Sequence, residues 1–454
     1  MNSVQSAVPR VLWPAVPGPV PARLLAMGFQ LEQSQWWSPA EIQGQQWRQL
    51  GQLLDHARTT VPFYRQRLGA AGDDPHREPS EDFWHGLPLL SRQDIQEAGQ
   101  ALVSDAIPPA HGGHRWLQTS GSTGRPIRAL GTGLTALFWN ALVLREHHWH
   151  RRDFSRRLCA LRAEAVDSAP DGIDGPDWGH PVSTVYRSGP ASLMGIHQSV
   201  ERQARWLVER DPGYLLTHPS NLRALARHFM DAGLRLPGLV QARTYGETVS
   251  DELRALVREA WEVPVVDAYS AQEVGYIALQ CPHHDHYHVQ SESLLVEVLD
   301  DDGRPCGPGE VGRIAMTTLH NFAMPLIRYV NQDYAEVGPP CPCGRGLPVL
   351  RRILGRRRNM LTLPDGRRFW PSFPAQLFTA VADIRQFQLI QDGPDHIELR
   401  VVAPGGLTPA QREELARRLV SRFGHPFEFR FELVDAIPQG AGHKYEDFIS
   451  RLGD

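Results

Sequence analysis

The sequence predicts an α/β protein with a large N-terminal mixed α/β domain, which contains a β-rich subregion, and a small C-terminal α+β domain. Apolar runs over residues 239–245 and 265–269 flank a helical pattern over 251–261, and this strand–helix–strand order is typical of mixed α/β sheets. From residue 292 onward, apolar residues alternate with charges and are interrupted by glycine turns, which indicates β-hairpins. Beyond residue 355, two strand patterns, a helix and a third strand predict the small domain.

The chain begins with a segment of unusual composition. Residues 1–37 are rich in proline and poorly periodic, so we expect an arm that lies on the surface. Ser38-Pro39-Ala40-Glu41 is a capping box with proline at the first helical position, which marks the start of a helix. The middle of the chain then alternates strand and helix patterns, with strands over 158–161 and 214–217 and helices over 199–209 and 221–232.

A domain boundary is predicted near Gly355, where the dense basic run Arg356-Arg357-Arg358 follows. Strand patterns over 387–390 and 396–402 surround a turn, and Thr408 caps a helix that Gly424 ends. Phenylalanines then alternate with charged residues, which indicates a half-buried strand. We therefore expect three parts: an arm (1–37), a large domain (38–355) and a small domain (356–454).

The composition excludes several classes of protein. The 454 residues are 41% hydrophobic and 22% charged, as in ordinary globular chains. A net charge of −4 excludes a broadly basic nucleic-acid coat, so we expect no nucleic-acid partner. No run of 18 apolar residues predicts a membrane-spanning helix, and the proline-broken N-terminus does not resemble a signal peptide, so the expected location is the cytoplasm.

One segment has the composition of a phosphate-binding loop. It reads Thr119-Ser120-Gly121-Ser122-Thr123-Gly124-Arg125-Pro126. Its two glycines let the backbone fold closely around an anion, while four hydroxyls and one guanidinium add donors. It is not a Walker loop, because the G-x-x-x-x-G-K-[ST] pattern is absent. The alternative interpretation is a polar surface loop.

Lys444 is the only lysine among 47 basic residues. Surface lysines can be replaced by arginine at little cost, but a site that requires a compact ammonium group cannot accept the wider, planar guanidinium. This makes Lys444 a candidate catalytic residue, with chance survival as the alternative.

Five motifs in order resemble the phenylacetate–CoA ligase-like, CapK-type branch of the AMP-forming adenylating enzymes. The family's phosphate loop matches residues 119–126, and its Y-G-x-x-E motif appears as 269–273, with Ser270 in place of glycine. Its I-R-Y-x-x-x-D motif matches 327–333, its C-x-C-G-R motif matches 341–345, and its G-K segment ends at Lys444. The matches extend from about residue 50 to 445, which is nearly the whole chain.

The resemblance implies a two-step reaction. A carboxylate attacks the α-phosphorus of ATP, which gives an acyl-adenylate and pyrophosphate, and a nucleophile, usually the thiol of coenzyme A, then displaces AMP. Fixed cations must point at the charge that builds up on the phosphate. The resemblance assigns this role to Lys444, which bridges the α-phosphate and the acid from a mobile small domain.

The resemblance also assigns the remaining site residues. Glu273 would hold Mg²⁺, and Thr123 joins Lys444 and Glu273 among the catalytic residues. Asp333 would accept both ribose hydroxyls of ATP. The ATP site is completed by the loop 119–125 and by Gly246, Glu247, Tyr269, Ser270, Arg328 and Arg356, of which the two arginines neutralise phosphate charge or fix the interdomain hinge.

The sequence leaves the substrate and the acceptor open. Arg357-Arg358-Asn359 stands where relatives carry acidic hinge residues, so the acceptor is either coenzyme A or an amine or carrier-protein thiol. A second alternative is a non-catalytic nucleotide-binding scaffold in capsule polysaccharide biosynthesis. Residues 162–194 are expected to contribute to the pocket for the carboxylic acid, but their composition selects no acid. The sequence does not determine the oligomeric state and leaves a homodimer open.

Cysteine and histidine residues suggest a metal site. Five cysteines in such a chain argue against a disulfide framework. Cys281 and His288 stand seven residues apart, and Cys341 and Cys343 form a C-x-C step, which together can supply four tetrahedral ligands. The family shows the same spacing, so we expect a structural Zn²⁺ site. The alternative is a set of buried thiols beside solvated histidines, and His283, His284 and His286 are expected to be surface residues or alternative ligands.

Overall fold

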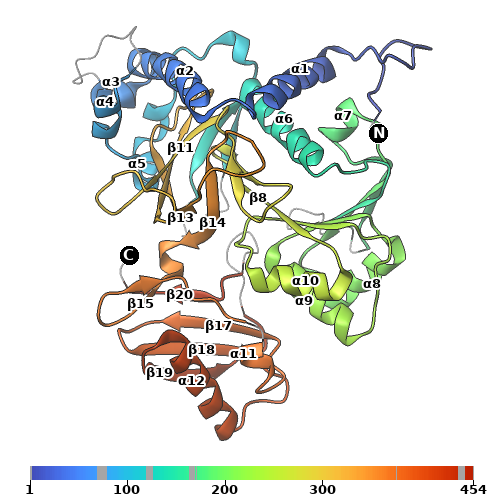
Figure 1. Cartoon of the computed structure of the whole chain (residues 1–454), viewed down its shortest axis with the longest axis vertical. Coiled ribbons are helices and arrows are strands. Elements are labelled where there is room, and N and C mark those ends of the chain that lie inside the picture. The colour runs from blue at the N-terminus through green and yellow to red at the C-terminus, as the bar shows by residue number, and fades with distance from the viewer. Residues whose placement is uncertain are drawn as a thin grey trace.

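The computed structural model describes residues 3–68, 79–118, 126–162, 169, 171–374, 376–437 and 445–452 (Figure 1). A twelve-stranded sheet forms the large domain, in the order β11-β12-β13-β14-β10-β9-β8-β7-β6-β3-β5-β4. One half is parallel and confirms the predicted mixed α/β pattern. Its strands are β5 (Ala191–Gly195), β3 (Leu158–Arg162), β6 (Tyr214–Thr217), β7 (Gln241–Tyr245) and β8 (Val265–Ala271), with the short β4 (Ile173–Gly175) antiparallel at the edge.

The other half of the sheet is antiparallel and forms the predicted β-rich subregion. It begins where β8 turns into β9, so the residues of this turn lie at the carboxyl edge of the parallel strands, where α/β proteins commonly bind ligands. Its strands are β9 (Gly275–Gln280), β10 (Tyr287–Val289), β14 (Val349–Arg356), β13 (Tyr329–Val337), β12 (Val311–Thr318) and β11 (Leu294–Leu299).

Helices cover both halves of the sheet (Figure 1). α8 (Val200–Arg210), α9 (Pro219–Asp231) and α10 (Asp251–Trp261) share an apolar core with the parallel half. A second core joins the antiparallel half to α2 (Pro39–Thr60), α3 (Pro62–Leu68), α4 (Glu81–Gly86) and α5 (Arg92–Ala98). The predicted capping box is confirmed, because the Ser38 hydroxyl accepts from the Glu41 amide and the Glu41 carboxylate accepts from the Ser38 amide. None of the described helices has the length and hydrophobicity needed to cross a membrane.

Further short elements complete the large domain. The hairpin β1 (His114–Gln118) and β2 (Arg128–Thr132) leads into α6 (Gly133–Trp149), and α7 (Val182–Val185) follows later in the chain. The 3₁₀ turns are η1 (Gly99–Leu102), η2 (Pro109–His111) and η3 (Arg357–Asn359).

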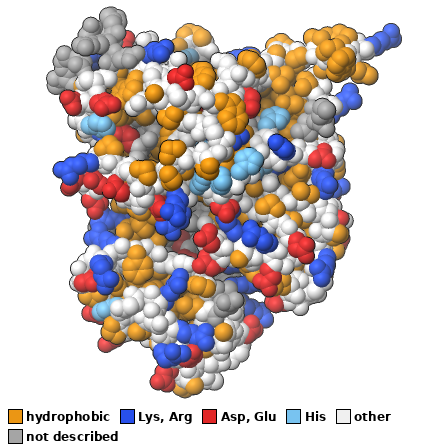
Figure 2. All heavy atoms as spheres, in the orientation of Figure 1, with side chains coloured by type: hydrophobic (Ala, Val, Ile, Leu, Met, Phe, Trp, Pro, Cys, Tyr) orange, Lys and Arg blue, Asp and Glu red, His pale blue; other side chains and the backbone are white. Residues whose placement is uncertain are grey.

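The N-terminal segment contains a helix that the proline-rich composition conceals. α1 (Pro19–Ser34) buries Leu24 and Leu31 in a core shared with α6 and α7, and its prolines stand in the first turn, where a missing amide hydrogen costs nothing. The residues before it leave Leu12 73% and Trp13 89% exposed. Hydrophobic side chains accordingly gather at the upper right of Figure 2, over this segment.

The small domain has the predicted ββαβ core. Its sheet has the order β19 (Glu428–Leu433), β18 (His396–Val402), β17 (Gln386–Gln391) and β20 (Phe448–Ser450), and it packs on α12 (Pro409–Phe423). β20, the last strand of the described residues, runs parallel to β17. Smaller elements are β15 (Leu361–Thr362), β16 (Arg368–Phe369) and α11 (Gln376–Thr379).

A buried carboxylate fixes α6 against the parallel sheet. Glu146 on α6 is bound by Arg152 at 2.7 Å and by Arg243 of β7 at 2.5 Å, and the side chains of Glu146 and Arg152 are at most 2% exposed. Arg152 also donates to Gln241 at 2.7 Å. Burial disfavours the carboxylate, but the two guanidinium groups outweigh it and hold the pKa of Glu146 well below its usual range. Glu146 is therefore ionised in the folded protein and compensates two buried cations.

We expect Glu146→Leu to lower the free energy of unfolding by about 3–5 kcal/mol, because it leaves two guanidinium groups buried without their counter-ion. Denaturant unfolding of the large domain measures this change. The matched control is Asp302→Asn, which removes an ion pair to Arg304 whose side chains are 68% and 74% exposed, and which should change stability by less than about 1 kcal/mol. Equal effects of the two substitutions would contradict the role of Glu146.

Candidate active site

A hydrogen-bonded cluster joins β8 to β13. The Tyr269 hydroxyl donates to Oδ2 of Asp333 at 2.6 Å, and the Asn331 amide donates to the same oxygen at 2.7 Å. Arg356 places Nε 3.7 Å from Oδ1 of Asp333. Three strands separate β8 from β13 in the sheet order, so the sheet curls to bring these side chains together. The structure thus brings Tyr269 and Arg356 to the carboxylate of Asp333, and all three were predicted to belong to the ATP site.

Glu273 lies beside this cluster, in the turn between β8 and β9. Only 9% of the residue is exposed, and its Oε1 accepts a hydrogen bond from the Tyr329 hydroxyl at 3.1 Å. Burial raises the pKa of Glu273, and the charge of Asp333 adds to this effect. A carboxylate in such surroundings gains from a bound cation, which fits the predicted Mg²⁺ ligand. Ser270 stands on β8 next to a bulge and pairs with Tyr276 of β9.

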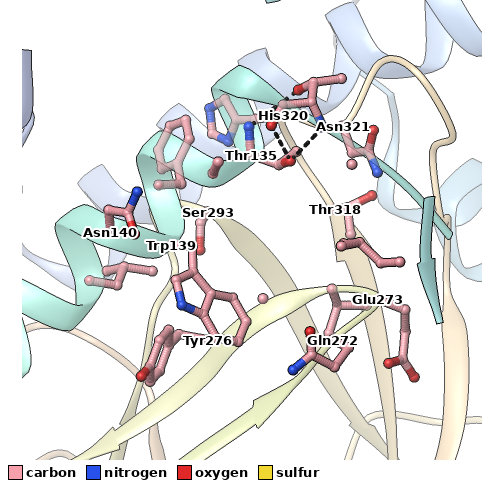
Figure 3. Close-up of a pocket in the computed structure, with 18 of the residues that line it drawn as sticks. Thr135, Trp139, Asn140, Gln272, Glu273, Tyr276, Ser293, Thr318, His320 and Asn321 are labelled. Atoms are coloured by element: carbon pink, nitrogen blue, oxygen red, sulfur yellow. Dashed lines mark hydrogen bonds between the residues drawn. The ribbon is translucent and has the colours of Figure 1, made fainter. Parts of the chain in front are cut away.

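A cavity of about 340 Å³ opens between α6 and the β8–β9 turn (Figure 3). Its apolar walls include Leu117, Leu130, Trp139 and Tyr276, and the rings of Trp139 and Tyr276 lie 4.8 Å apart. Glu273 lines the same cavity. The cavity can therefore hold an aromatic or short branched group next to the carboxylate cluster. Further lining residues are polar: Thr135, Asn140, Gln272, Ser293, Thr318 and Asn321.

Apart from Glu273, the residues that line the cavity were not among the predicted site residues. Of the stretch 162–194, His180 is the described residue that lines the cavity, whereas Trp178 and Tyr186 pack in the core around Phe154. The signal that could have indicated the walls is the aromatic pair Phe138-Trp139, because it stands on the helix that follows the phosphate-binding loop.

The predicted phosphate-binding loop, residues 119–125, lies outside the described residues, as does Lys444. The strands that flank the loop are described: Gln118 at the end of β1 pairs with Arg128 at the start of β2. Leu117, Leu130 and Gly131 of this hairpin line the cavity. The hairpin that carries the loop therefore borders the cavity.

Arg328, one of the residues expected at the ATP site, makes its contacts within the core of the large domain. Its guanidinium pairs with Glu297 at 3.1 Å and donates to the backbone carbonyls of Trp84, His85 and Leu87. The residue is 2% exposed. These contacts occupy the guanidinium and fix the end of α4 to the antiparallel sheet, so we leave Arg328 out of the site.

The turn after β7 meets the small domain. Gly246 has a φ of 81°, a conformation that favours glycine, as the predicted tight turn requires. The Glu247 carboxylate accepts from the Ser220 amide at 2.8 Å and from the Ser220 hydroxyl at 3.0 Å. It also accepts from the Tyr445 amide at 3.0 Å, and Tyr445 is the residue that follows Lys444 in the chain.

Three of the four predicted metal ligands form one cluster with His286, and the fourth, Cys343, lies next to it. The ligand atoms of Cys281, His286, His288 and Cys341 are all within 4.8 Å of one another, and Cys343 Sγ lies 3.4 Å from Nε2 of His288. The two sulfur atoms of Cys281 and Cys341 are 3.9 Å apart, close to the separation of about 3.8 Å that tetrahedral Zn–S bonds of about 2.3 Å require. Burial lowers the pKa of His288 to about 3, which keeps its imidazole neutral. The donor set therefore fits Zn²⁺, with His286 as an additional ligand candidate.

Comparisons with known proteins show what the chain is similar to. Residues 361–451 match the family model of the CapK C-terminal domain. The chain is 25% identical to the phenylacetate–coenzyme A ligase of Thermus thermophilus over 80% of this chain and 81% of the relative. It is 26% identical to the phenylacetate–coenzyme A ligase of Escherichia coli K12 over 74% of this chain and 75% of the relative. These similarities confirm the resemblance predicted from the motifs.

Solved structures confirm the fold. A 2-hydroxyisobutyryl-CoA ligase in its postadenylation state superimposes with a TM-score of 0.70 at 19% identity, over 93% of this chain and 92% of that chain. The same enzyme in its thioesterification state gives a TM-score of 0.58 at 20% identity, over 90% of each chain. The chain therefore has the architecture of adenylate-forming CoA ligases, with a large and a small domain.

Proposed function

We propose that the protein is an AMP-forming acid–thiol ligase, which activates a carboxylic acid with ATP and transfers the acyl group to coenzyme A. The observation that carries this proposal is the hydrogen-bonded pair of Tyr269 and Asp333 beside Glu273, which lines the aromatic cavity. The similarity to curated phenylacetate–coenzyme A ligases over most of the chain supports it.

The nucleotide would bind through the carboxylate cluster. The carboxylate of Asp333 can accept hydrogen bonds from both ribose hydroxyls, and such charge-assisted bonds are strong. Tyr269 and Asn331 already orient this carboxylate by donating to it. Arg356 is close enough to turn from Asp333 toward a phosphate group. Glu273 would hold Mg²⁺, which when bound neutralises charge on phosphate oxygens.

The acid would bind in the aromatic cavity. A volume of about 340 Å³ walled by Trp139 and Tyr276 suits an aryl, arylacetic or short branched acid, because the aromatic walls match a compact apolar group better than an extended chain. Because Glu273 lines the same cavity, an acid bound there lies beside the proposed Mg²⁺ and the phosphates. Such proximity lets the carboxylate attack the α-phosphorus without a large rearrangement.

ATP–pyrophosphate exchange across a panel of acids tests this assignment. We expect exchange with at least one aryl, arylacetic or short branched acid and none with palmitate. Trp139→Ala should raise the KM for the preferred acid at least about tenfold and leave the KM for ATP unchanged, because it removes one wall of the cavity. Phe29→Ala is the control, since Phe29 is 67% exposed on α1. A preference for long-chain acids would contradict the assignment of the cavity.

Lys444 is proposed to bridge the α-phosphate and the incoming carboxylate. We expect Lys444→Ala to abolish adenylate formation while ATP binding persists, because the other groups of the nucleotide site are unchanged. Lys444→Arg should also fail, since a guanidinium does not replace a compact ammonium group. Pyrophosphate exchange and ATP titration by calorimetry measure the two properties. A Lys444→Ala enzyme that adenylates at the wild-type rate would exclude this role.

The acceptor in the second step distinguishes coenzyme A from an amine or a carrier-protein thiol. The predicted hinge differs from that of relatives, because it carries Arg357 and Arg358 where they have acidic residues. Arg358 pairs with Glu446 at 2.7 Å within the small domain. All three acceptors should therefore be tested. Screening acceptors after adenylation separates them. A non-catalytic scaffold in capsule biosynthesis is disfavoured, because the chain keeps Lys444, Glu273 and Asp333 together.

The cysteine and histidine cluster is proposed to be a structural Zn²⁺ site. Its ligands come from β10 and from the loops that follow β9 and β13, so a bound ion would tie these segments together. Zn²⁺ binds cysteine as a thiolate and histidine as a neutral imidazole, and the proposed ligands are of these two types.

Protein purified without a histidine tag should contain about one equivalent of zinc by elemental analysis. We expect Cys281→Ser and Cys341→Ser to lose the metal and to lower the melting temperature, because the site closes the β-rich subregion. Cys306→Ser is the control, since Cys306 lies outside the cluster. Less than about a tenth of an equivalent of zinc in the wild-type protein would end the proposal.

A further inference from the structure

We propose that Glu247 is a positioning residue for adenylation, which holds the small domain against the large domain through the Tyr445 backbone. This inference rests on the proposed function, and it gives Glu247 a role other than the adenine contact that the motif suggests. Its basis is a carboxylate that takes hydrogen bonds from both domains.

On the large-domain side, Glu247 is held firmly. Its Oε2 accepts from the Ser220 amide at 2.8 Å, and its Oε1 accepts from the Ser220 hydroxyl at 3.0 Å. Ser220 stands in the first turn of α9, where backbone amides lack partners within the helix and the helix dipole favours a negative charge. The carboxylate therefore has a fixed position before the small domain reaches it.

On the small-domain side, Glu247 binds the backbone next to the catalytic lysine. Oε1 accepts from the Tyr445 amide at 3.0 Å, and Lys444 is the preceding residue in the chain. This hydrogen bond restrains the position of the backbone at residue 445 and does not depend on the Tyr445 side chain. Tyr445 leads directly into β20, so the contact is coupled to the core of the small domain.

Other contacts support the same arrangement of the domains. The Ser372 hydroxyl donates to Glu252 of α10 at 2.8 Å. Burial raises the pKa of Asp447, and the charge of Arg223 on α9 partly offsets this effect. Both α9 and α10 thus face the small domain with polar groups. Arg223 and Arg227 of α9 lie near Tyr445, and Glu247 accepts a hydrogen bond from the backbone amide of Tyr445.

The fold similarity differs between two states of one relative. The chain superimposes on the postadenylation state of 2-hydroxyisobutyryl-CoA ligase with a TM-score of 0.70, and on its thioesterification state with 0.58. In this proposal the Glu247–Tyr445 contact belongs to the adenylation arrangement and breaks before the small domain rotates for the second step.

The chemistry of glutamate suits this role better than that of glutamine. Glu247 accepts three hydrogen bonds through its two oxygens. A glutamine has one carbonyl oxygen, so its amide nitrogen would face either the Ser220 amide or the Tyr445 amide, and two donors would then oppose each other. Glu247→Gln therefore keeps the size of the side chain but weakens the contact between the domains.

Kinetics of the two half-reactions test the inference. For Glu247→Gln we expect the kcat of ATP–pyrophosphate exchange to fall at least about tenfold, while the KM for ATP changes less than about threefold. Thioester formation from supplied acyl-adenylate should keep its wild-type rate, because that step uses another arrangement. Glu259→Gln, on the exposed face of α10, is the matched control and should change neither step.

Hydrogen exchange supplies a second readout that does not depend on activity. The Tyr445 amide should be protected in the wild-type protein and exchange faster in Glu247→Gln, while β17 keeps its protection. A large rise in the KM for ATP with an unchanged kcat would overturn the inference in favour of adenine binding. An equal loss of both half-reactions, or unchanged protection of Tyr445, would also overturn it. If the wild-type enzyme showed no ATP–pyrophosphate exchange with any acid, the proposed function would be refuted instead. The hydrogen-exchange result would still show whether Glu247 holds the Tyr445 amide.

Discussion

The position of α6 against the parallel sheet is the constraint on which the proposed site depends. Glu146 fixes this position, because its two oxygens bind Arg152 after the helix and Arg243 on β7. α6 carries Trp139 into the cavity, and β7 continues three residues beyond Arg243 into the Gly246-Glu247 turn. One buried carboxylate thus couples the wall of the acid cavity to the turn that meets the small domain. A shift of α6 would disturb substrate binding and domain docking together.

The curl of the sheet supplies the second element of the site. Tyr269 and Asp333 belong to strands that are not neighbours, yet their side chains share a hydrogen bond of 2.6 Å. Strands with a right-handed twist accumulate such curvature when the sheet is long. The change from parallel to antiparallel pairing at β8 and β9 places Glu273 in the turn, so the curved sheet collects three acidic or phenolic groups at one edge. Local sequence alone does not determine this convergence.

The sequence predicted what depends on neighbours along the chain. The capping box at Ser38 and the glycine at position 246 are determined by local backbone chemistry, and both are as expected. The sequence could not predict that Glu297 occupies the Arg328 guanidinium, or that Glu247 accepts from an amide 198 residues away. The lining of the cavity was missed for a related reason: α6 is apolar around much of its circumference, so its pattern does not reveal which face meets a ligand.

The arginine-rich composition acquires a physical meaning in this structure. Arginine fixes parts of the fold to one another: Arg152 bridges Glu146 and Gln241, and the Arg345 guanidinium lies 4.7 Å from the ring of Trp36 and 4.5 Å from that of Trp149. The planar fork of a guanidinium suits such permanent, multi-point contacts, whereas an ammonium is a compact charge on a flexible stem. A residue that must approach a phosphate for one step and withdraw for the next needs such a flexible ammonium group. The single lysine of the chain stands at the position where the proposed reaction requires that property, next to the backbone that Glu247 holds.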